Sequence, residues 1–328
     1  MNRYSGCGVL RCALVAGVLG SCEQNAQAQP LTPGNLLVSN LGTGVAGEYT
    51  PTGGLVRSFT FPDFEGGFHD LRDIHVSTDG NVQAFNGTFT PQLSTLVPTT
   101  GTITSQPFAG WSTINNISFG GVAAFGNSAA FVTDMATAGA GAPQGIVRFS
   151  LTGGPASRFA TSGGYQDLTI GGDGLLYALH GEGLPASTVD VYDPNSLAFV
   201  RTINFDSTLF GADVRGIAVS PSGAIFAAAW NGTVYAASSG GAVLNSRVTG
   251  FSNLTDIDLD NSGQLVIGSR FGNVILTTTS LASQTSFTLG GGPTVHVAFT
   301  SPLPVPEPTS LSLCGLAAVV LAWRRRRK

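Results

Sequence analysis

The sequence predicts an all-β body, and three observations lead to this prediction. The 328 residues include 45 glycines and only 10% charged residues. Short apolar runs rich in Val, Thr and Phe alternate with turn residues, which is typical of strands. Hardly any segment repeats its apolar residues with the period of a helix. The length alone fits one large β domain as well as two small ones.

Internal repeats decide between these two arrangements. An apolar-x-apolar strand followed by a turn with a small last residue occurs five times, ending at Gly80, Ser128, Gly174, Gly223 and Gly263. Successive copies are therefore 48, 46, 49 and 40 residues apart, which is the size of a propeller blade with four short strands. Most of these turns end in Asp-Gly or Ser-Gly, which supplies the positive φ that a tight hairpin needs.

The two ends of the body, residues 29–304, supply a sixth unit. Residues 295–299 are typical of an innermost strand, and residues 36–59 of the three outer strands of the same blade. Joined, they close a six-bladed β-propeller without open sheet edges between blades. A seven-bladed ring is the alternative. The repeat pattern resembles the NHL and gluconolactonase-like propellers over nearly the whole body.

Residues 1–28 have the layout of a secretory signal peptide. Two arginines precede an apolar stretch at 13–19, and Ala26-Gln27-Ala28 forms a small-x-small cleavage site. We expect cleavage after Ala28. The alternative is a lipobox at residues 19–22, in which Cys22 carries the lipid.

Residues 305–328 form a separate C-terminal segment. Pro306 and Pro308 keep Glu307 in extended, accessible backbone. The apolar run at 311–323 would form a helix shorter than the roughly 20 residues that span a bilayer. The basic cluster that follows it, at 324–328, favours a cytoplasmic location for this end.

This order of features resembles the PEP-CTERM sorting signal of bacteria that produce exopolysaccharide. The matching residues are Val305, Pro306, Glu307 and Pro308, and then Arg324, Arg325, Arg326 and Arg327. The resemblance implies transient insertion in the inner membrane and recognition by an exosortase, a membrane cysteine protease-transpeptidase. It also implies loss of the tail and delivery of the body to the cell surface or extracellular matrix. A plain membrane anchor is the alternative.

Charge and cysteine content restrict the chemistry of the body. All four cysteines lie outside it, at positions 7, 12, 22 and 314, which excludes disulfides and thiol catalysis within it. Between residues 29 and 305 there are 8 arginines and 17 acidic residues, for a formal charge of −9. This charge argues against nucleic-acid binding and allows cation binding.

Alignment of the innermost strands places polar residues in rings about the axis. One ring is His296, His75, Ala123, Thr169, Ala218 and Asp258, and the other is Thr294, Asp73, Gly121, Asp167, Gly216 and Asp256. Arg72 and Arg215 are expected near the entrance to the axis. These acids and imidazoles are candidate ligands for calcium or zinc, and the alternative is a hydrogen-bonded polar belt. The sequence assigns no cofactor.

No catalytic residue is predicted, because the body contains neither a Gly-x-Ser-x-Gly elbow nor a His-Glu-x-x-His motif. We therefore expect a surface or matrix protein whose propeller binds a polysaccharide or a protein, or has a structural role. The alternative is a secreted metal-dependent hydrolase or lyase that acts at the axis, as the enzymes that the body resembles do.

Overall fold

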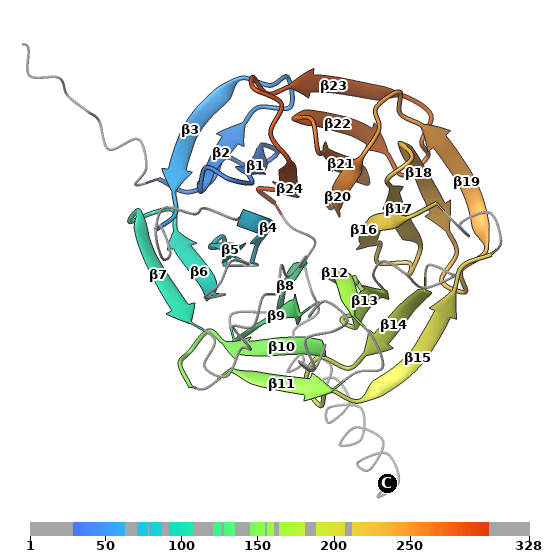
Figure 1. The fold of residues 1–328 in the computed structure, drawn as a ribbon, viewed down its shortest axis with the longest axis horizontal. Helices are drawn as coiled ribbons and strands as arrows, with labels where there is room; N and C mark the ends of the chain where they lie inside the picture. The colour runs from blue at the N-terminus through green and yellow to red at the C-terminus, as the bar shows by residue number, and fades with distance from the viewer. Residues whose placement is uncertain are drawn as a thin grey trace, which may run out of the picture.

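The computed structural model is an all-β propeller of six blades, which confirms the predicted fold (Figure 1). It describes residues 29–62, 71–77, 79–86, 92–107, 121–125, 128–134, 145–154, 156–160, 164–180, 188–206 and 212–301. The predicted signal peptide, the sorting segment and its apolar helix lie outside these ranges. Within them, no helix is long and apolar enough to cross a membrane.

Five blades follow the chain, each an antiparallel sheet that starts at the axis and ends at the rim (Figure 1). Blade 2 has β4 (Leu71–Val76), β5 (Val82–Asn86), β6 (Gln92–Val97) and β7 (Thr102–Pro107). Blade 3 has β8 (Val122–Phe125), β9 (Ala129–Asp134), β10 (Gly145–Ser150) and β11 (Ser157–Ala160). Blade 4 has β12 (Tyr165–Ile170), β13 (Leu176–His180), β14 (Thr188–Tyr192) and β15 (Phe199–Asn204). Blade 5 has β16 (Val214–Val219), β17 (Ile225–Ala229), β18 (Thr233–Ala237) and β19 (Val243–Val248). Blade 6 has β20 (Leu254–Leu259), β21 (Gln264–Ser269), β22 (Asn273–Thr278) and β23 (Gln284–Thr288).

Blade 1 closes the ring with strands from both ends of the body. Its innermost strand is β24 (Val295–Phe299), followed outward by β1 (Leu36–Asn40), β2 (Val45–Tyr49) and β3 (Leu55–Thr60). β24 pairs antiparallel with β1 along all five residues, from Leu36 opposite Phe299 to Asn40 opposite Val295. The closure deduced from the two partial repeats is therefore present in the structure.

Side-chain contacts reinforce this closure. The Thr300 hydroxyl donates to the carbonyl oxygens of Thr32, at 2.7 Å, and Asn35, at 3.0 Å. In the same blade, the buried Glu48 carboxylate pairs with Arg57 at 2.7 Å. Arg57 also donates to the carbonyl oxygens of Gln29 and Pro30, each at 2.7 Å. Residues 29 and 30, where the described chain starts, are thus bound to β3, the outermost strand of blade 1. The innermost strand of the same blade is β24.

The predicted hairpin turns have the expected backbone. Gly80, Gly174, Gly223 and Gly263 all have φ between 79° and 82°. Only glycine adopts this conformation without strain, so these turns fix where each innermost strand ends. The blades then pack face to face, and each of the six interfaces between neighbouring blades holds one cluster of buried apolar side chains. Their packing holds the innermost strands around the axis.

Candidate functional site at the propeller axis

The innermost strands share a local irregularity that directs side chains at the axis. In β4, β12, β16 and β20 the pairing register shifts by one residue, between Leu71 and Asp73 in β4 and at the matching place in the other three. A β-bulge of this kind adds an unpaired residue and turns the neighbouring side chains. The extra residues are Arg72, Gln166, Arg215 and Thr255, and each directly precedes a residue of the first axial ring.

The structure corrects the predicted register of β24. Thr300 N donates to the carbonyl of Asn35, just as Ser77 N donates to Asn81 and Ser220 N to Ala224 at the ends of β4 and β16. This equivalence aligns His296, four residues before Thr300, with Asp73 and Gly216. The first ring is therefore Asp73, Gly121, Asp167, Gly216, Asp256 and His296. The prediction that His296 shares a ring with His75 is wrong by two residues, and Ala298 takes that place.

Three carboxylates in this ring fasten one blade to the next. Asp73 accepts from its neighbour Ile74 N at 2.7 Å and from Val122 N of blade 3 at 2.6 Å. Asp167 repeats this arrangement with Leu168 N at 2.8 Å and Ile217 N of blade 5 at 2.7 Å. Asp256 does so with Ile257 N and Val297 N of blade 1, each at 2.7 Å. Carboxylates therefore join alternate pairs of blades, from 2 to 3, 4 to 5 and 6 to 1.

The two glycines of the ring make room for these carboxylates. A Cβ on Gly121 would lie 2.5 Å from Leu168 N and would also collide with a carboxylate oxygen of Asp167. A Cβ on Gly216 would lie 2.8 Å from the Cα of Asp256. Asp and Gly thus alternate around the axis until blade 1, where His296 stands in the place of a third glycine. His296 breaks an otherwise threefold pattern.

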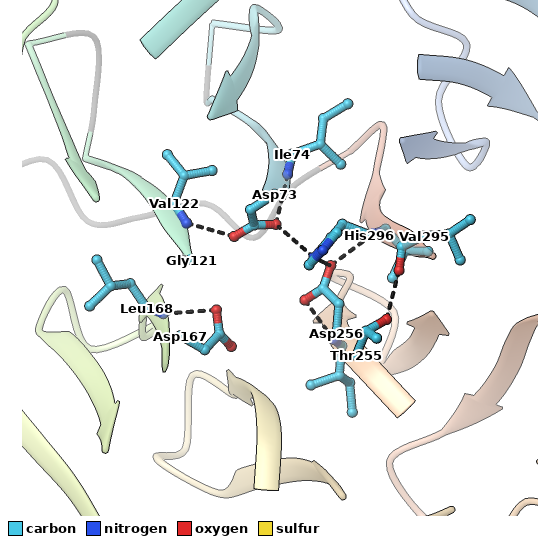
Figure 2. A network of polar contacts seen from close by, with 12 residues as sticks. Asp73, Ile74, Gly121, Val122, Asp167, Leu168, Thr255, Asp256, Val295 and His296 are labelled. Atoms are coloured by element: carbon cyan, nitrogen blue, oxygen red, sulfur yellow. Dashed lines mark hydrogen bonds and ion pairs between the residues drawn. The ribbon is translucent and has the colours of Figure 1, made fainter. Parts of the chain in front are cut away.

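His296 lies between the carboxylates of blades 2 and 6 (Figure 2). Its Nδ1 is 4.0 Å from Asp73 Oδ1 and 3.8 Å from Asp256 Oδ2. These separations are beyond hydrogen-bond length. The imidazole is 16% exposed, whereas the two carboxyl groups are 7% and 9% exposed. One ligand atom from each of the three side chains lies within 4.8 Å of the others, a spacing compatible with a metal ion.

Burial and mutual repulsion perturb the acids of the axis. Burial raises the pKa of Asp73 well above its usual value, and the charges of Asp256 and Asp167 raise it further. The hydrogen bonds from the two backbone N–H groups lower it by less than this. Burial likewise raises the pKa of Asp167, and that of Asp256 to about 7. The pKa of His296 falls to about 3, because of burial and then of the nearby Arg72 charge. The buried ring therefore disfavours simultaneous ionisation of neighbouring carboxyl groups, and it also disfavours protonation of the His296 imidazole.

The second axial ring is His75, Ala123, Thr169, Ala218, Asp258 and Ala298. Asp258 accepts from Leu259 N and from Phe299 N of blade 1, each at 2.8 Å, so it repeats the bridge that Asp256 makes two residues earlier. Burial raises the pKa of Asp258 to about 6 and lowers that of His75 to about 4. Neither His75 nor Asp258 belongs to the group of three side chains whose spacing is compatible with a metal ion.

The predicted arginines occupy the bulge positions beside the first ring. Arg215 lies over the ring of Trp230 at 4.8 Å and donates to Asp213 at 2.6 Å. Its Nη1 also donates to the side-chain oxygen of Gln166, at 2.8 Å, in the amide orientation that satisfies both groups. Arg72 lies close enough to His296 to lower its pKa. The structure therefore places both arginines around the axis, with Arg215 held by Trp230, Asp213 and Gln166.

A second buried polar cluster, in blade 4, was not predicted from the sequence. Asp190 accepts from Tyr165 at 2.6 Å, from Thr202 at 2.5 Å and faces His180 Nε2 at 2.8 Å. Although burial acts to raise its pKa, these hydrogen bonds hold it at about 2. Its only sequence signal is an acid between two valines in a strand. This cluster lies within one blade and includes no residue of the first axial ring.

Comparison with known families decides the nature of the C-terminal segment. A family model described as the PEP-CTERM protein-sorting motif matches residues 304–327. The chain carries a PEP-CTERM sorting signal. This signal implies recognition by an exosortase and export to the surface or the extracellular space, as the residues 305–308 and 324–327 predicted. A search of curated proteins finds no match.

Solved structures resemble the body in fold. The Neurospora crassa Pan2 WD40 domain matches with 14% identity and a TM-score of 0.50, over 84% of this chain and 78% of that one. Apo AztD from Citrobacter koseri matches with 11% identity and a TM-score of 0.48, over 80% and 97%. At these identities the likeness concerns the fold alone.

Proposed function

We propose that the protein is an exosortase-processed surface or matrix protein whose propeller is a binding or structural module. The observation that carries this proposal is the PEP-CTERM signal at 304–327, directly after a body whose last described strand ends at Phe299. Because the signal begins beyond the closed ring, its removal would leave all six blades intact. The product would be a compact acidic domain outside the inner membrane.

We propose the axial end with the bulge residues as the ligand-binding face. The guanidinium of Arg215 beside Trp230, with Gln166 next to it, offers hydrogen-bond donors beside an aromatic ring. Such a combination suits a hydroxyl-rich ligand, for which a polysaccharide is the first choice and a protein the second. A nucleic-acid ligand is disfavoured by the charge of −9 that the body carries.

Processing is tested by replacing the Pro-Glu-Pro box in a bacterium that has an exosortase. Glu307→Ala with Pro308→Ala should leave the tail uncut and the protein in the membrane fraction. The matched control Pro302→Ala changes a proline outside the motif and should be exported like the parent chain. Mass spectrometry of both termini reads the result. An intact Lys328 on extracellular parent protein would contradict the proposal, as would normal processing of the double variant.

Ligand binding is tested with an array of bacterial polysaccharides and glycans. The parent protein should bind at least one of them, and Arg215→Ala should bind it more weakly. Arg201→Ala is the control, because Arg201 lies exposed on the outermost strand of blade 4. An array without any binding would favour a passive structural role. Equal loss with both variants would exclude the axial face as the binding surface.

The second candidate is a secreted metal-dependent hydrolase or lyase acting at the axis. The observation that favours it is the convergence of Asp73, Asp256 and His296 on one point. In such an enzyme a bound ion would polarise a substrate oxygen or activate a water molecule. Turnover of an ester or glycoside by the parent protein, lost after chelation, would support it. Turnover that persists in a chelated sample would refute the role of the metal.

A further inference from the structure

We propose that Asp73, Asp256 and His296 form a binding site for one divalent transition-metal ion of the zinc type. The existence of the site does not depend on the proposed function. Only a catalytic role of the ion rests on the second candidate function, the metal-dependent hydrolase or lyase. The site itself is argued from the geometry of the ring, and an ion at this place could equally serve to hold the blades together.

The first argument is the break in the threefold pattern. Two of the three places between carboxylates hold glycines, because a Cβ at Gly121 or Gly216 would strike the next blade. The third place holds the imidazole of His296, the one large polar side chain among the three. A ring that needed only the blade-to-blade bridges would be completed by a third small residue. The imidazole therefore adds a donor that the bridges do not require.

The second argument is the state of the donor atoms. Among the described residues, His296 Nδ1 approaches Asp73 Oδ1 only to 4.0 Å and Asp256 Oδ2 only to 3.8 Å, so it makes no hydrogen bond to either carboxylate. Asp73 Oδ1 and Asp256 Oδ2 each accept one backbone N–H. A carboxylate oxygen has two lone pairs, so each keeps one for a further partner. Backbone bonds already fix the direction of both carboxylates, as ligand-orienting contacts do in metal sites.

The third argument is distance. A tetrahedral zinc ion with bonds of about 2.0–2.1 Å sets its ligand atoms about 3.3–3.4 Å apart. The nitrogen–oxygen separations are 4.0 and 3.8 Å, so closure by roughly 0.5 Å brings them to that value. The three ligand atoms all lie within 4.8 Å of one another, so binding would require rotation of the His296 ring together with a small shift of the two carboxylates. Water that reaches the partly exposed His296 side chain, which is 16% exposed, can supply the remaining ligands.

The donor set also selects the class of ion. One imidazole nitrogen and two carboxylate oxygens suit zinc and its first-row neighbours, whereas calcium takes six to eight oxygen ligands. Within the part of the chain that the structure describes, three protein donors converge here, and one of them is nitrogen. We therefore expect zinc, cobalt or manganese to bind more tightly than calcium.

The test measures metal binding by the full-length chain in mild detergent. Cys7→Ser, Cys12→Ser, Cys22→Ser and Cys314→Ser are introduced together, because thiolates outside the body would bind zinc themselves. After treatment with a chelator, the protein is dialysed against Zn²⁺, Co²⁺ or Ca²⁺ and its metal content is measured by mass spectrometry. We expect one zinc ion per chain and no calcium at the same concentration.

The variants decide which residues hold the ion. His296→Ala and Asp73→Asn should weaken zinc binding by more than about 100-fold, because loss of a ligand exceeds the 10–100-fold effect of an orienting residue. Asp167→Asn is the matched control. Asp167 belongs to the same ring and makes the same two N–H contacts, but its neighbours are glycines. This variant should bind zinc like the parent protein.

Folding is followed by circular dichroism, and His296→Ala keeps the test valid if Asp73→Asn unfolds, since His296 bridges no backbone. In the Co²⁺ form, His296→Ala should also abolish the visible ligand-field absorption. Absence of stoichiometric zinc, unchanged binding in His296→Ala, or equal loss in Asp167→Asn would each overturn the proposal. None of these results affects the processing experiment, so failure of the metal site and failure of the export function are distinguishable.

Discussion

Replacement of Gly121 by alanine tests whether the axial ring is as tightly built as its geometry indicates. The new Cβ would lie 2.5 Å from Leu168 N and 2.7 Å from Asp167 Cα, where ordinary contact begins at 3.4 Å. Both atoms belong to the backbone of β12, so a side-chain rotation cannot relieve the clash. Blades 3 and 4 must separate by roughly 1 Å, and overpacking of this kind costs about 1–3 kcal/mol.

The same displacement strains the Asp167 carboxylate, which joins blade 4 to blade 5 through Ile217 N. A weakened buried hydrogen bond adds about 1–3 kcal/mol. We therefore expect a total loss of about 2–6 kcal/mol, and a Tm lower by at least about 4 °C for a domain of this size. Differential scanning calorimetry measures it.

Gly290→Ala is the control for this experiment. Its Cβ would meet nothing within 4 Å and its φ is not in the left-handed region, so its Tm should match that of the parent. Equal melting temperatures for Gly121→Ala and the parent protein would refute the idea that close approach selects glycine in this ring.

Three further predictions concern the remaining polar contacts. Arg57→Met should cost about 3–5 kcal/mol in denaturant unfolding, because it leaves the fully buried Glu48 without its charge partner; the control Arg201→Met, on an exposed strand, should cost less than about 1 kcal/mol. A comparable loss in both would contradict this. The folded-state pKa of Asp190, about 2, lies below its value of 3.8 in model compounds. Stability from this group is therefore complete above about pH 4 and is lost as the pH falls through 2, and Asp190→Asn should remove this part of the pH dependence measured by thermal unfolding; an unchanged acid profile would argue against it. Thr300→Val should cost about 1 kcal/mol by removing its bonds to Thr32 and Asn35, and hydrogen exchange in β1 should accelerate, whereas exchange in β13 of blade 4, on the opposite side of the ring, should stay unchanged.

The blade count and the innermost strands were predictable because each of five units contains a recognisable turn on which the repeats can be aligned. A hairpin turn ending in a small residue joins the first and second strands, and the glycine in four of these turns has the positive φ that its position requires. In blade 1 the corresponding strands, β24 and β1, lie at opposite ends of the body and share no turn. Nothing local fixes their register, so the sequence pattern alone puts His296 two residues from its true place in the ring.

The other misses have a similar origin in non-local geometry. A bulge adds one residue without changing the apolar pattern noticeably, so the positions of Arg72 and Arg215 near the axis are predictable from the sequence, whereas the partners of Arg215 are not. The cluster around Asp190 draws its members from all four strands of one blade. Sequence spacing alone gives no sign that Tyr165 and Thr202 meet the same carboxylate.

The position of β24 has a consequence for the timing of secretion. In an exported chain, blade 1 lacks its innermost strand until Phe299 has crossed the membrane, because β24 is the last of the described strands in chain order. The sorting motif begins only five residues later, at position 304. If the tail holds the chain in the inner membrane, as the resemblance to sorting signals implies, the chain would by then have just exported the last described strand of the ring. The pause would give the ring time to close, so that the exosortase meets a folded cargo.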